Sequence, residues 1–250
     1  MARILITSGP TRQYLDPVRY LTNASSGRMG AALAAAAMDA GHQVVIVTGP
    51  VSIEYPAAAQ RISVVTTDEM LEAAIRLFDD CQGVIGAAAP CDYMPRKVLR
   101  EKIAKTGEPL RVELIETPDV VATLGQRKRD DQWVVGFALE TEDQRFRATV
   151  KLERKHCDLM VSNGPQAIDS DRNEVELLAA SGEVLETISG TKVEVARRLI
   201  GQIDARLIQP SAKRRESPPR SESPPRSGRP ERSESLEQPG RSGRPAGGKR

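Results

Sequence analysis

Short apolar runs rich in β-branched residues alternate with stretches of helical periodicity through most of the chain. "RILITS", "QVVIVTG", "ISVVT" and "GVIGAAA" are typical of buried strands. Helices are predicted over residues 27–40 and from Asp68, the second with Thr67 as its cap. "RVELIE", "WVVGFALE" and "DLMVSN" continue the strand series, with helices opening at "TPDVVATL" and spanning residues 142–156. This alternation predicts βαβ units and a largely parallel sheet.

The pattern changes after the last of these strands. "EVELLAA" and "EVLETI" flank Ser181 and Gly182, which predicts a β-hairpin, and "TKVEVARRLIGQIDARLI" predicts a closing helix. The predicted fold class is therefore α/β, with an open, doubly wound, Rossmann-like, mostly parallel sheet and an antiparallel edge hairpin over residues 1–209. Ligands of such sheets bind at the carboxyl ends of the strands, where loops face a common crevice.

Residues 210–250 have a different composition. They repeat "ESPPRS" and "SGRP", contain no aromatic residue, and are predicted to form a disordered tail that cannot bury enough apolar surface to fold. Their Lys and Arg exceed their Glu by six, so a whole-chain formal charge of +2 leaves the preceding body with a net charge of about −4. We interpret the tail as a solubilising extension, and contact with nucleic acid is the alternative.

Several function classes find little support in the sequence. The N-terminus shows no basic region, long apolar helix or cleavage site, so we expect a cytoplasmic protein without a membrane partner. The three cysteines lack CxxC spacing and there are only two histidines, which argues against a zinc site or a Cys/His catalytic pair. Neither GxGxxG after the first strand nor GxxxxGK[ST] is present, which weakens a dehydrogenase or an ordinary phosphate-loop NTPase.

One candidate site is the helix entrance "NASSGRMG" at residues 23–30, directly before "AALAAAA". Ser25, Ser26 and Gly27 place hydroxyls and unpaired N–H groups at the start of this helix, which is a favourable arrangement for phosphate. Ser8 and Gly9 end the first strand beside it. A plain helix cap explains the same residues equally well.

A second candidate is "AAAPCDYMPRKVLREKIAK", in which small residues end a strand and a Pro-rich loop follows. Small residues allow a ligand to approach the backbone. This loop carries Asp92, Arg96, Lys97, Arg100, Lys102 and Lys105. Lys151 and Lys155 lie one turn apart on a later helix. For both groups of cations a solvated surface is the alternative.

Taken in order, "ILITSGPTRQYLDPVRYLTNASSGRMG", "AAAPCDYMP" with "EKIAK", "TPDVV", "VVGFALET" and "KLERKHCDLMVSN" closely resemble the phosphopantothenoylcysteine synthetase family. The resemblance runs from about residue 3 to 205. It implies a ligase of coenzyme A biosynthesis that joins 4′-phosphopantothenate to L-cysteine through an acyl-nucleotide. CTP is the expected nucleotide, with ATP as the alternative, and Mg²⁺ and a homodimer are expected. The stand-alone form is expected, so no FMN should bind.

The resemblance also implies roles for individual residues. Asn23 would orient the acyl-nucleotide for attack by the cysteine amine, and Lys102, in a flap formed by the "EKIAK" loop, would neutralise charge in the transition state. Arg19 and Ala89, with Asn23, match the substrate pocket. The nucleotide-binding positions implied are Ser8, Gly9, Ser25, Ser26, Gly27, Asp92, Lys102, Phe137, Lys151 and Lys155. No metal ligand is identified.

Some positions depart from the family pattern. They are Arg28, Pro90, Cys91, Ala104 and Gly164. None removes a group with an assigned role, but we expect Pro90 and Cys91 to change the shape of the nucleotide or cysteine pocket. The reaction needs no enzyme thiol, so Cys91 is interpreted as a small residue at a strand end.

Overall fold

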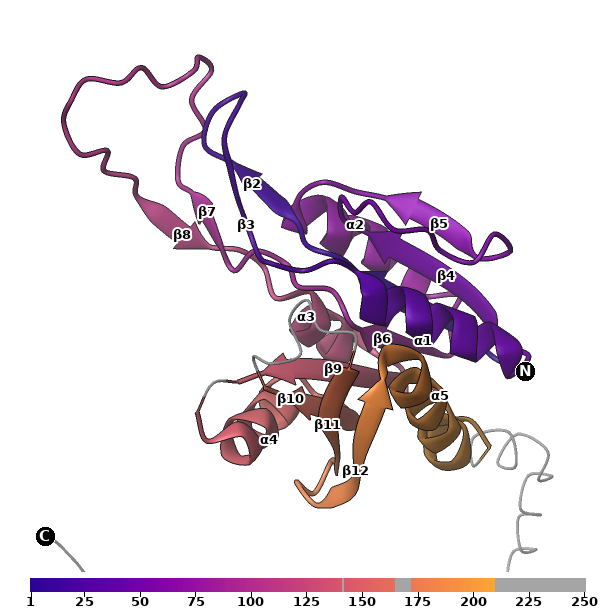
Figure 1. Cartoon of the computed structure of the whole chain (residues 1–250). Coiled ribbons are helices and arrows are strands. Elements are labelled where there is room, and N and C mark those ends of the chain that lie inside the picture. The colour runs from indigo at the N-terminus through magenta and orange to yellow at the C-terminus, as the bar shows by residue number, and fades with distance from the viewer. Residues whose placement is uncertain (141, 165–171, 210–250) are drawn as a thin grey trace, which may run out of the picture. The chain divides into compact units, whose positions relative to one another are not determined.

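An eight-stranded sheet in the order β12-β11-β10-β9-β6-β1-β4-β5 organises the computed structural model, which describes residues 1–140, 142–164 and 172–209 (Figure 1). Its parallel strands are β1 Arg3–Ser8, β4 Gln43–Thr48, β5 Gln60–Ser63, β6 Gly83–Gly86, β9 Trp133–Leu139 and β10 Leu159–Asn163. β11 Arg172–Ala179 and β12 Val184–Thr191 form an antiparallel hairpin at one edge. The predicted fold class is confirmed.

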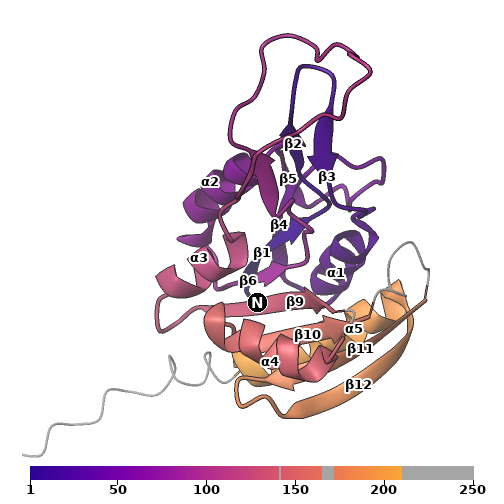
Figure 2. The ribbon, with the colours of Figure 1, turned by 90° about the vertical axis from the view of Figure 1, so that its left-hand side faces the viewer.

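Helices cover both faces of this sheet (Figure 2). The helices are α1 Arg28–Asp39, α2 Thr67–Phe78, α3 Val120–Arg127, α4 Gln144–Arg154 and α5 Lys192–Ile203, with a π-helical turn at Asp204–Ile208. Because successive side chains of a strand alternate between faces, Ile4 and Ile6 pack with α1 and α5, whereas Leu5 packs with the other three helices. Two apolar cores therefore hold the strand ends in fixed positions.

The helix starts show one error in the sequence-based prediction. The cap of α2 is Thr66 and not Thr67: the Thr66 hydroxyl accepts a hydrogen bond from the Glu69 N–H at 3.2 Å, and the Glu69 side chain closes a capping box. Thr67 is instead buried, with its hydroxyl 2.8 Å from that of Thr11. Adjacent threonines give the same local signal, and only packing distinguishes them.

Two short antiparallel ribbons stand apart from the main sheet. One pairs β2 Arg12–Tyr14 with β3 Tyr20–Thr22, within the connection between β1 and α1. The other pairs β7 Tyr93–Pro95 with β8 Leu114–Glu116. The placement of "RVELIE" in the main series of strands was therefore wrong, because β8 pairs with β7 and is half-exposed. We call residues 12–22 and 93–116 the arm, which projects from the sheet in Figures 1 and 2.

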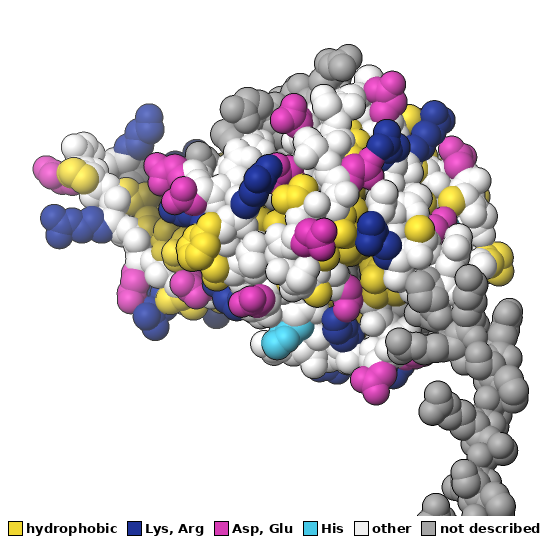
Figure 3. Space-filling view, turned by 90° about the horizontal axis from the view of Figure 1, so that it is seen from below, with side chains coloured by type: hydrophobic (Ala, Val, Ile, Leu, Met, Phe, Trp, Pro, Cys, Tyr) yellow, Lys and Arg dark blue, Asp and Glu magenta, His cyan; other side chains and the backbone are white. Residues whose placement is uncertain are grey.

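The surface of the arm is partly apolar. Figure 3, viewed from below, shows yellow side chains gathered toward the arm, among scattered charges of both signs. The exposed large apolar residues of the arm are Val18, Tyr20, Tyr93, Val98, Leu99, Leu110, Val112 and Leu114.

Other predictions have simple outcomes. Cys81, Cys91 and Cys157 are buried free thiols. None of the described helices is long and apolar enough to cross a membrane. The predicted tail at 210–250, with its proposed nucleic-acid contact, lies outside the described residues.

Candidate functional site

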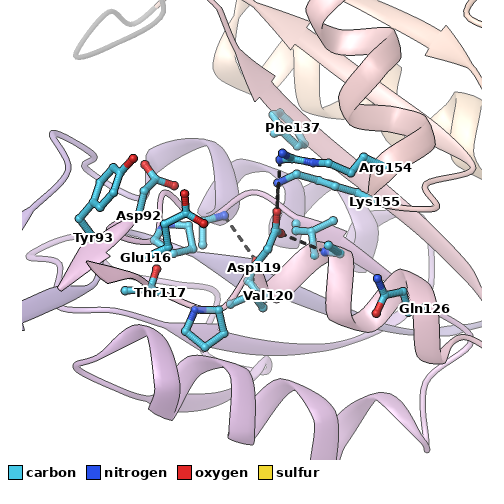
Figure 4. Close-up of a pocket in the computed structure, with 17 residues that line it drawn as sticks. Asp92, Tyr93, Glu116, Thr117, Asp119, Val120, Gln126, Phe137, Arg154 and Lys155 are labelled. Carbon is cyan, nitrogen blue, oxygen red and sulfur yellow. Dashed lines mark hydrogen bonds and ion pairs between the residues drawn. The ribbon is translucent and has the colours of Figure 1, made fainter. Parts of the chain in front are cut away.

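A cavity of about 420 Å³ opens at the carboxyl ends of β1, β6 and β9 (Figure 4). Its lining includes Thr7 of β1, Gly86 of β6 and Phe137 of β9. After β1, the strands β4 and β5 are added on one side of it. The chain then crosses to the other side of β1, where β6 and β9 lie. The cavity thus lies at the topological switch point, where an open α/β sheet is expected to bind its ligand.

Three further elements complete the walls of the cavity. The first turn of α3 contributes Asp119 and Val120, and the end of α4 contributes Arg154 and Lys155. The base of the β7–β8 ribbon contributes Asp92, Tyr93 and Glu116, which Figure 4 shows grouped on the opposite side from the two cations. The cavity is therefore cationic at one end and acidic at the other.

Asp119 organises the cationic end. Its Oδ1 accepts a hydrogen bond from the Ala122 N–H at 3.0 Å, which caps α3, and its Oδ2 lies 3.1 Å from Lys155 Nζ and 3.7 Å from the Arg154 guanidinium. The N-terminus of a helix carries partial positive charge and free N–H groups. An anionic ligand group would therefore meet two side-chain cations and a helix start at this end.

Of the predicted nucleotide-binding residues, the structure brings Asp92, Phe137 and Lys155 together in this cavity. Glu116, Asp119, Gln126 and Arg154 also line it and were missed. The sequence pattern could have identified Asp119, because an aspartate directly before a predicted helix is a typical capping residue. Glu116 had none, since its strand was assigned to the main sheet.

The entrance of α1 is built differently from the prediction. Gly27 is the N-cap, with a φ of 76°, and no side chain donates or accepts a capping hydrogen bond there. Of the alternative in which Ser25, Ser26 and Gly27 form only a helix cap, the structure shows Gly27 as the cap and no capping hydrogen bond from a side chain. The buried Ser8 hydroxyl donates to the Gly27 carbonyl at 3.2 Å and accepts from Tyr55 at 2.9 Å, so it shapes this loop. The cavity lining does not include Ser8, Gly9 or residues 25–27.

Asn23 connects the α1 entrance to the cavity. Its Nδ2 donates a hydrogen bond to the carbonyl of Pro90 at 2.8 Å, and Pro90 lines the cavity. The next residue toward the strand, Ala89, donates its N–H to the Gly9 carbonyl at 2.9 Å. The candidate substrate residues Asn23 and Ala89 thus lie at the boundary between the two regions.

Cys91 has a structural role at the same boundary. Its N–H donates to the Thr11 hydroxyl at 2.8 Å, its carbonyl accepts from the Thr117 hydroxyl at 2.7 Å, and its Sγ donates to the Tyr93 carbonyl at 3.2 Å. These contacts fix the turn from β6 into β7. The interpretation of Cys91 as a small residue at a strand end agrees with them.

The two candidate lysines of α4 both contact carboxylates. Lys151 Nζ lies 2.5 Å from Oε1 of the buried Glu140, and Lys155 pairs with Asp119 as described. Both lysines are therefore paired with carboxylates on a helix whose other residues are mostly exposed. Lys151 nevertheless does not line the cavity.

Arg19 and Lys102 both lie on the arm and do not line the cavity. The Arg19 guanidinium contacts Asp16 at 2.6 Å and the carbonyl of Ile103 at 3.1 Å. Lys102 is exposed within the loop that joins β7 to β8. Only part of the predicted site is therefore assembled in one place.

Known protein sequences match this chain over most of its length. A family model described as the DNA/pantothenate metabolism flavoprotein C-terminal domain matches residues 1–207. The coenzyme A biosynthesis bifunctional protein CoaBC of Haemophilus influenzae is 37% identical over 206 residues, which are 81% of this chain and 51% of that protein. CoaBC of Escherichia coli is 43% identical over 188 residues, 72% of this chain and 46% of that protein. The chain spans about half the length of these relatives.

Two solved structures have a similar fold. The crystal structure of the C-terminal domain of a CoaBC protein is 37% identical, with a TM-score of 0.68, over 81% of this chain and 94% of that one. A Cab2 mutant in complex with phosphopantothenate-cysteine has a TM-score of 0.71 at 16% identity, over 86% of this chain and 89% of that one. The second likeness shows a shared fold alone.

Proposed function

Because the chain belongs to the family of the DNA/pantothenate metabolism flavoprotein C-terminal domain, we propose that it is a phosphopantothenate–cysteine ligase of coenzyme A biosynthesis. It would join 4′-phosphopantothenate to L-cysteine through an acyl-cytidylate, with release of CMP and pyrophosphate, in the cytoplasm and without FMN. The observation that carries this proposal is the cavity at the switch point, where Asp92, Phe137 and Lys155 meet and which Asn23 reaches through Pro90. The CoaBC relatives of coenzyme A biosynthesis support the choice of reaction.

The cavity offers contacts for the base, the ribose and the phosphates of CTP. Phe137 would lie beside the base and Asp92 would accept hydrogen bonds from the ribose or base. Lys155 and Arg154, with the start of α3, would hold phosphate oxygens, and Lys151 and residues 25–27 would act on them from nearby. Attack of a carboxylate on the α-phosphate brings two anions together, so fixed cations lower the barrier.

Mg²⁺ would bind together with the triphosphate. The ion is commonly held by one or two carboxylates together with phosphate oxygens and water. No cluster of three or more His, Cys, Asp or Glu exists among the described residues, so an all-protein cage is not expected there. The Glu116 carboxylate lines the cavity, and it makes no hydrogen bond or ion pair within the described part of the chain. Glu116 and Asp92 lie at the end opposite the expected phosphates, so the Mg²⁺ that supplies charge neutralisation on the triphosphate would be held mainly by phosphate oxygens and water.

Asn23 would act in the second half of the reaction. The cysteine amine attacks the acyl carbonyl, the C–N bond forms, and CMP leaves with the electron pair of the broken C–O bond. The Asn23 amide, 2.8 Å from the Pro90 carbonyl, would donate to the acyl oxygen and stabilise the tetrahedral oxyanion. Activation of the carboxylate precedes attack by the cysteine amine, so activation does not require Asn23.

A second copy of the chain would complete the site. The arm exposes apolar side chains such as Val18, Val98 and Leu110, each more than half exposed. Exposed apolar surface of this kind is typical of protein interfaces. The same arm carries Arg19 and Lys102, which lie outside the cavity of their own chain. We therefore include in the proposal a homodimer in which the arm of one subunit serves the cavity of the other.

The test is pyrophosphate release from 4′-phosphopantothenate and Mg²⁺ with CTP or ATP, each with and without cysteine. We expect CTP to be preferred and full turnover to require cysteine. Asn23→Asp should still release pyrophosphate, form no amide product and accumulate the acyl-nucleotide. Asn173→Asp is the control, because it is the same change at a residue of β11 whose Oδ1 accepts a hydrogen bond from Lys192, the first residue of α5. No release with either nucleotide would overturn the ligase assignment, and normal product from Asn23→Asp would overturn the role of that residue.

A further inference from the structure

The two segments of the arm meet at one buried carboxylate. Asp16, between β2 and β3, is fully buried. Its Oδ1 accepts hydrogen bonds from the N–H groups of Val18 and Arg19, both at 2.8 Å, which closes the local turn. Its Oδ2 accepts from Arg19 Nη1 at 2.6 Å and from the N–H of Ile103 at 3.0 Å, 87 residues away in the sequence. One oxygen therefore serves the turn, and the other reaches the loop between β7 and β8.

Arg19 binds the carbonyl group of Ile103, whose N–H is bound by Asp16. Its Nη1 also donates to the Ile103 carbonyl at 3.1 Å, so both peptide groups of Ile103 are bound by the β2–β3 segment. A second contact, from the Leu99 N–H to the Leu15 carbonyl at 3.0 Å, aligns the two segments further back. Lys102 precedes Ile103 directly, and its side chain has no hydrogen bond or ion pair within the described ranges. The position of its ammonium group is thus limited mainly by the backbone that Asp16 and Arg19 hold.

The charge of Asp16 is maintained by these contacts. Burial alone would raise the pKa of Asp16, but the N–H groups of Ile103, Val18 and Arg19, together with the Arg19 guanidinium, hold this pKa well below its usual range. The side chain is therefore a carboxylate at neutral pH, and both of its oxygens are occupied. A turn needs only one of them.

We propose that Asp16 is a positioning residue of the ligation reaction: it holds Arg19 and the peptide groups of Ile103 together, so that Lys102 acts from a fixed backbone. This inference rests on the proposed function. A lysine on an untethered loop must lose its freedom of movement at the transition state, whereas a tethered lysine has lost most of that freedom beforehand. Asp16 touches no substrate in this account and acts on the reaction through Lys102, with Arg19 as part of the tether.

Asp16→Asn separates the tether from the local turn. An amide presents one acceptor oxygen, so it cannot accept from the two turn N–H groups and from Ile103 as well. Hydrogen exchange of the full chain without ligands, followed by mass spectrometry of the peptide that contains Ile103, should show at least tenfold faster exchange at that amide. Glu113→Gln is the matched control, because it removes an exposed ion pair with Arg96, at 2.7 Å, from the same arm. Unchanged exchange at Ile103 in Asp16→Asn would overturn the tether.

Kinetics then distinguish positioning from a structural role. Asp16→Asn should lower kcat for pyrophosphate release by roughly ten- to a hundredfold and leave the KM for CTP nearly unchanged, because the cavity is untouched. The double variant with Lys102→Gln should be no slower than Lys102→Gln alone. Independent, multiplying losses would overturn the proposal, and so would a normal kcat in a variant whose loop exchanges faster.

Two provisions keep the outcome decisive. If Asp16→Asn does not fold, Ile103→Pro removes the same N–H donor from the loop side, and the same fall in kcat is expected. If the unaltered chain releases no pyrophosphate, the proposed function has failed, whereas the exchange experiment still decides whether Asp16 holds Ile103.

Discussion

Replacing Lys155 by Gln tests whether the cationic end of the cavity binds nucleotide. Lys155 ends α4 with its Nζ 3.1 Å from Asp119 Oδ2, and its side chain is only 17% exposed. Gln keeps much of the length and polarity of the side chain but removes its charge. After the change, the Asp119 carboxylate retains only the more distant Arg154, at 3.7 Å, as a cationic neighbour.

The magnitude follows from these contacts. A hydrogen bond between charged groups contributes about 1.5–3 kcal/mol. At about 1.4 kcal/mol per factor of ten, the Kd for Mg²⁺-CTP should rise by roughly ten- to a hundredfold. A partly exposed ion pair contributes at most about 1 kcal/mol to folding. The Tm should therefore fall by no more than about 2–4 °C.

Isothermal titration calorimetry of the full chain with Mg²⁺-CTP is the assay, and Lys128→Gln is the matched control. Lys128 also pairs with a carboxylate, Asp158, at 2.8 Å, and its side chain is 23% exposed. It donates in addition to the His156 carbonyl at 2.9 Å and does not line the cavity. We expect this control to lose at least as much stability and to keep its Kd. An unchanged Kd in Lys155→Gln, or equal increases in both variants, would refute the reasoning.

Two further predictions concern stability. Asp119→Ala should lower the free energy of unfolding by about 1 kcal/mol, because the α3 cap is lost. Asp119→Asn keeps an acceptor for the Ala122 N–H, so its free energy of unfolding should fall clearly less. Equal losses in urea denaturation would assign the effect to the ion pair. Burial raises the pKa of Cys157 from 9.0 to about 12, so above pH 9 the unfolded thiol ionises while the native one stays protonated. Stability should therefore fall between pH 9 and 12, and less steeply in Cys157→Ala, with urea titrations at pH 8 and 10 as the check.

The main sheet was predictable because its signals are local and repeated. Runs such as "RILITS" and "QVVIVTG" are long, apolar and separated by helical patterns, and each is consistent only with a buried strand between helices. β8 shows where this approach fails. Its apolar pattern correctly indicated a strand, but the partner of a strand depends on contacts with the whole fold. The half-exposed ribbon it forms with β7 has no separate local signal.

The candidate site and the arm also contain residues that the sequence identified and residues that it did not. Asp92, Phe137 and Lys155 were assigned through a family resemblance, and the fold brings them into one cavity although they lie before β7, within β9 and directly after α4. Asp16 was missed, although it is the most completely hydrogen-bonded acid of the arm. Locally it resembles a turn aspartate, and the feature that distinguishes it, the Ile103 N–H, lies 87 residues away. Periodicity and spacing do not contain that information.

The division of cations between cavity and arm has a physical reason. Within the cavity and beside it, Lys155 and Lys151 already contact Asp119 and Glu140, so a phosphate must compete with a carboxylate for each of them. That competition limits affinity but keeps these buried charges paired when no ligand is bound. Lys102 has no such partner in the described part of the chain, and near Asp92 and Glu116 it would acquire one. In the proposed reaction, Asp16 and Arg19 would hold Lys102 on the arm, and its charge would remain available for the negative charge that develops in the transition state. A cation used in this way accelerates the reaction rather than only binding the substrate.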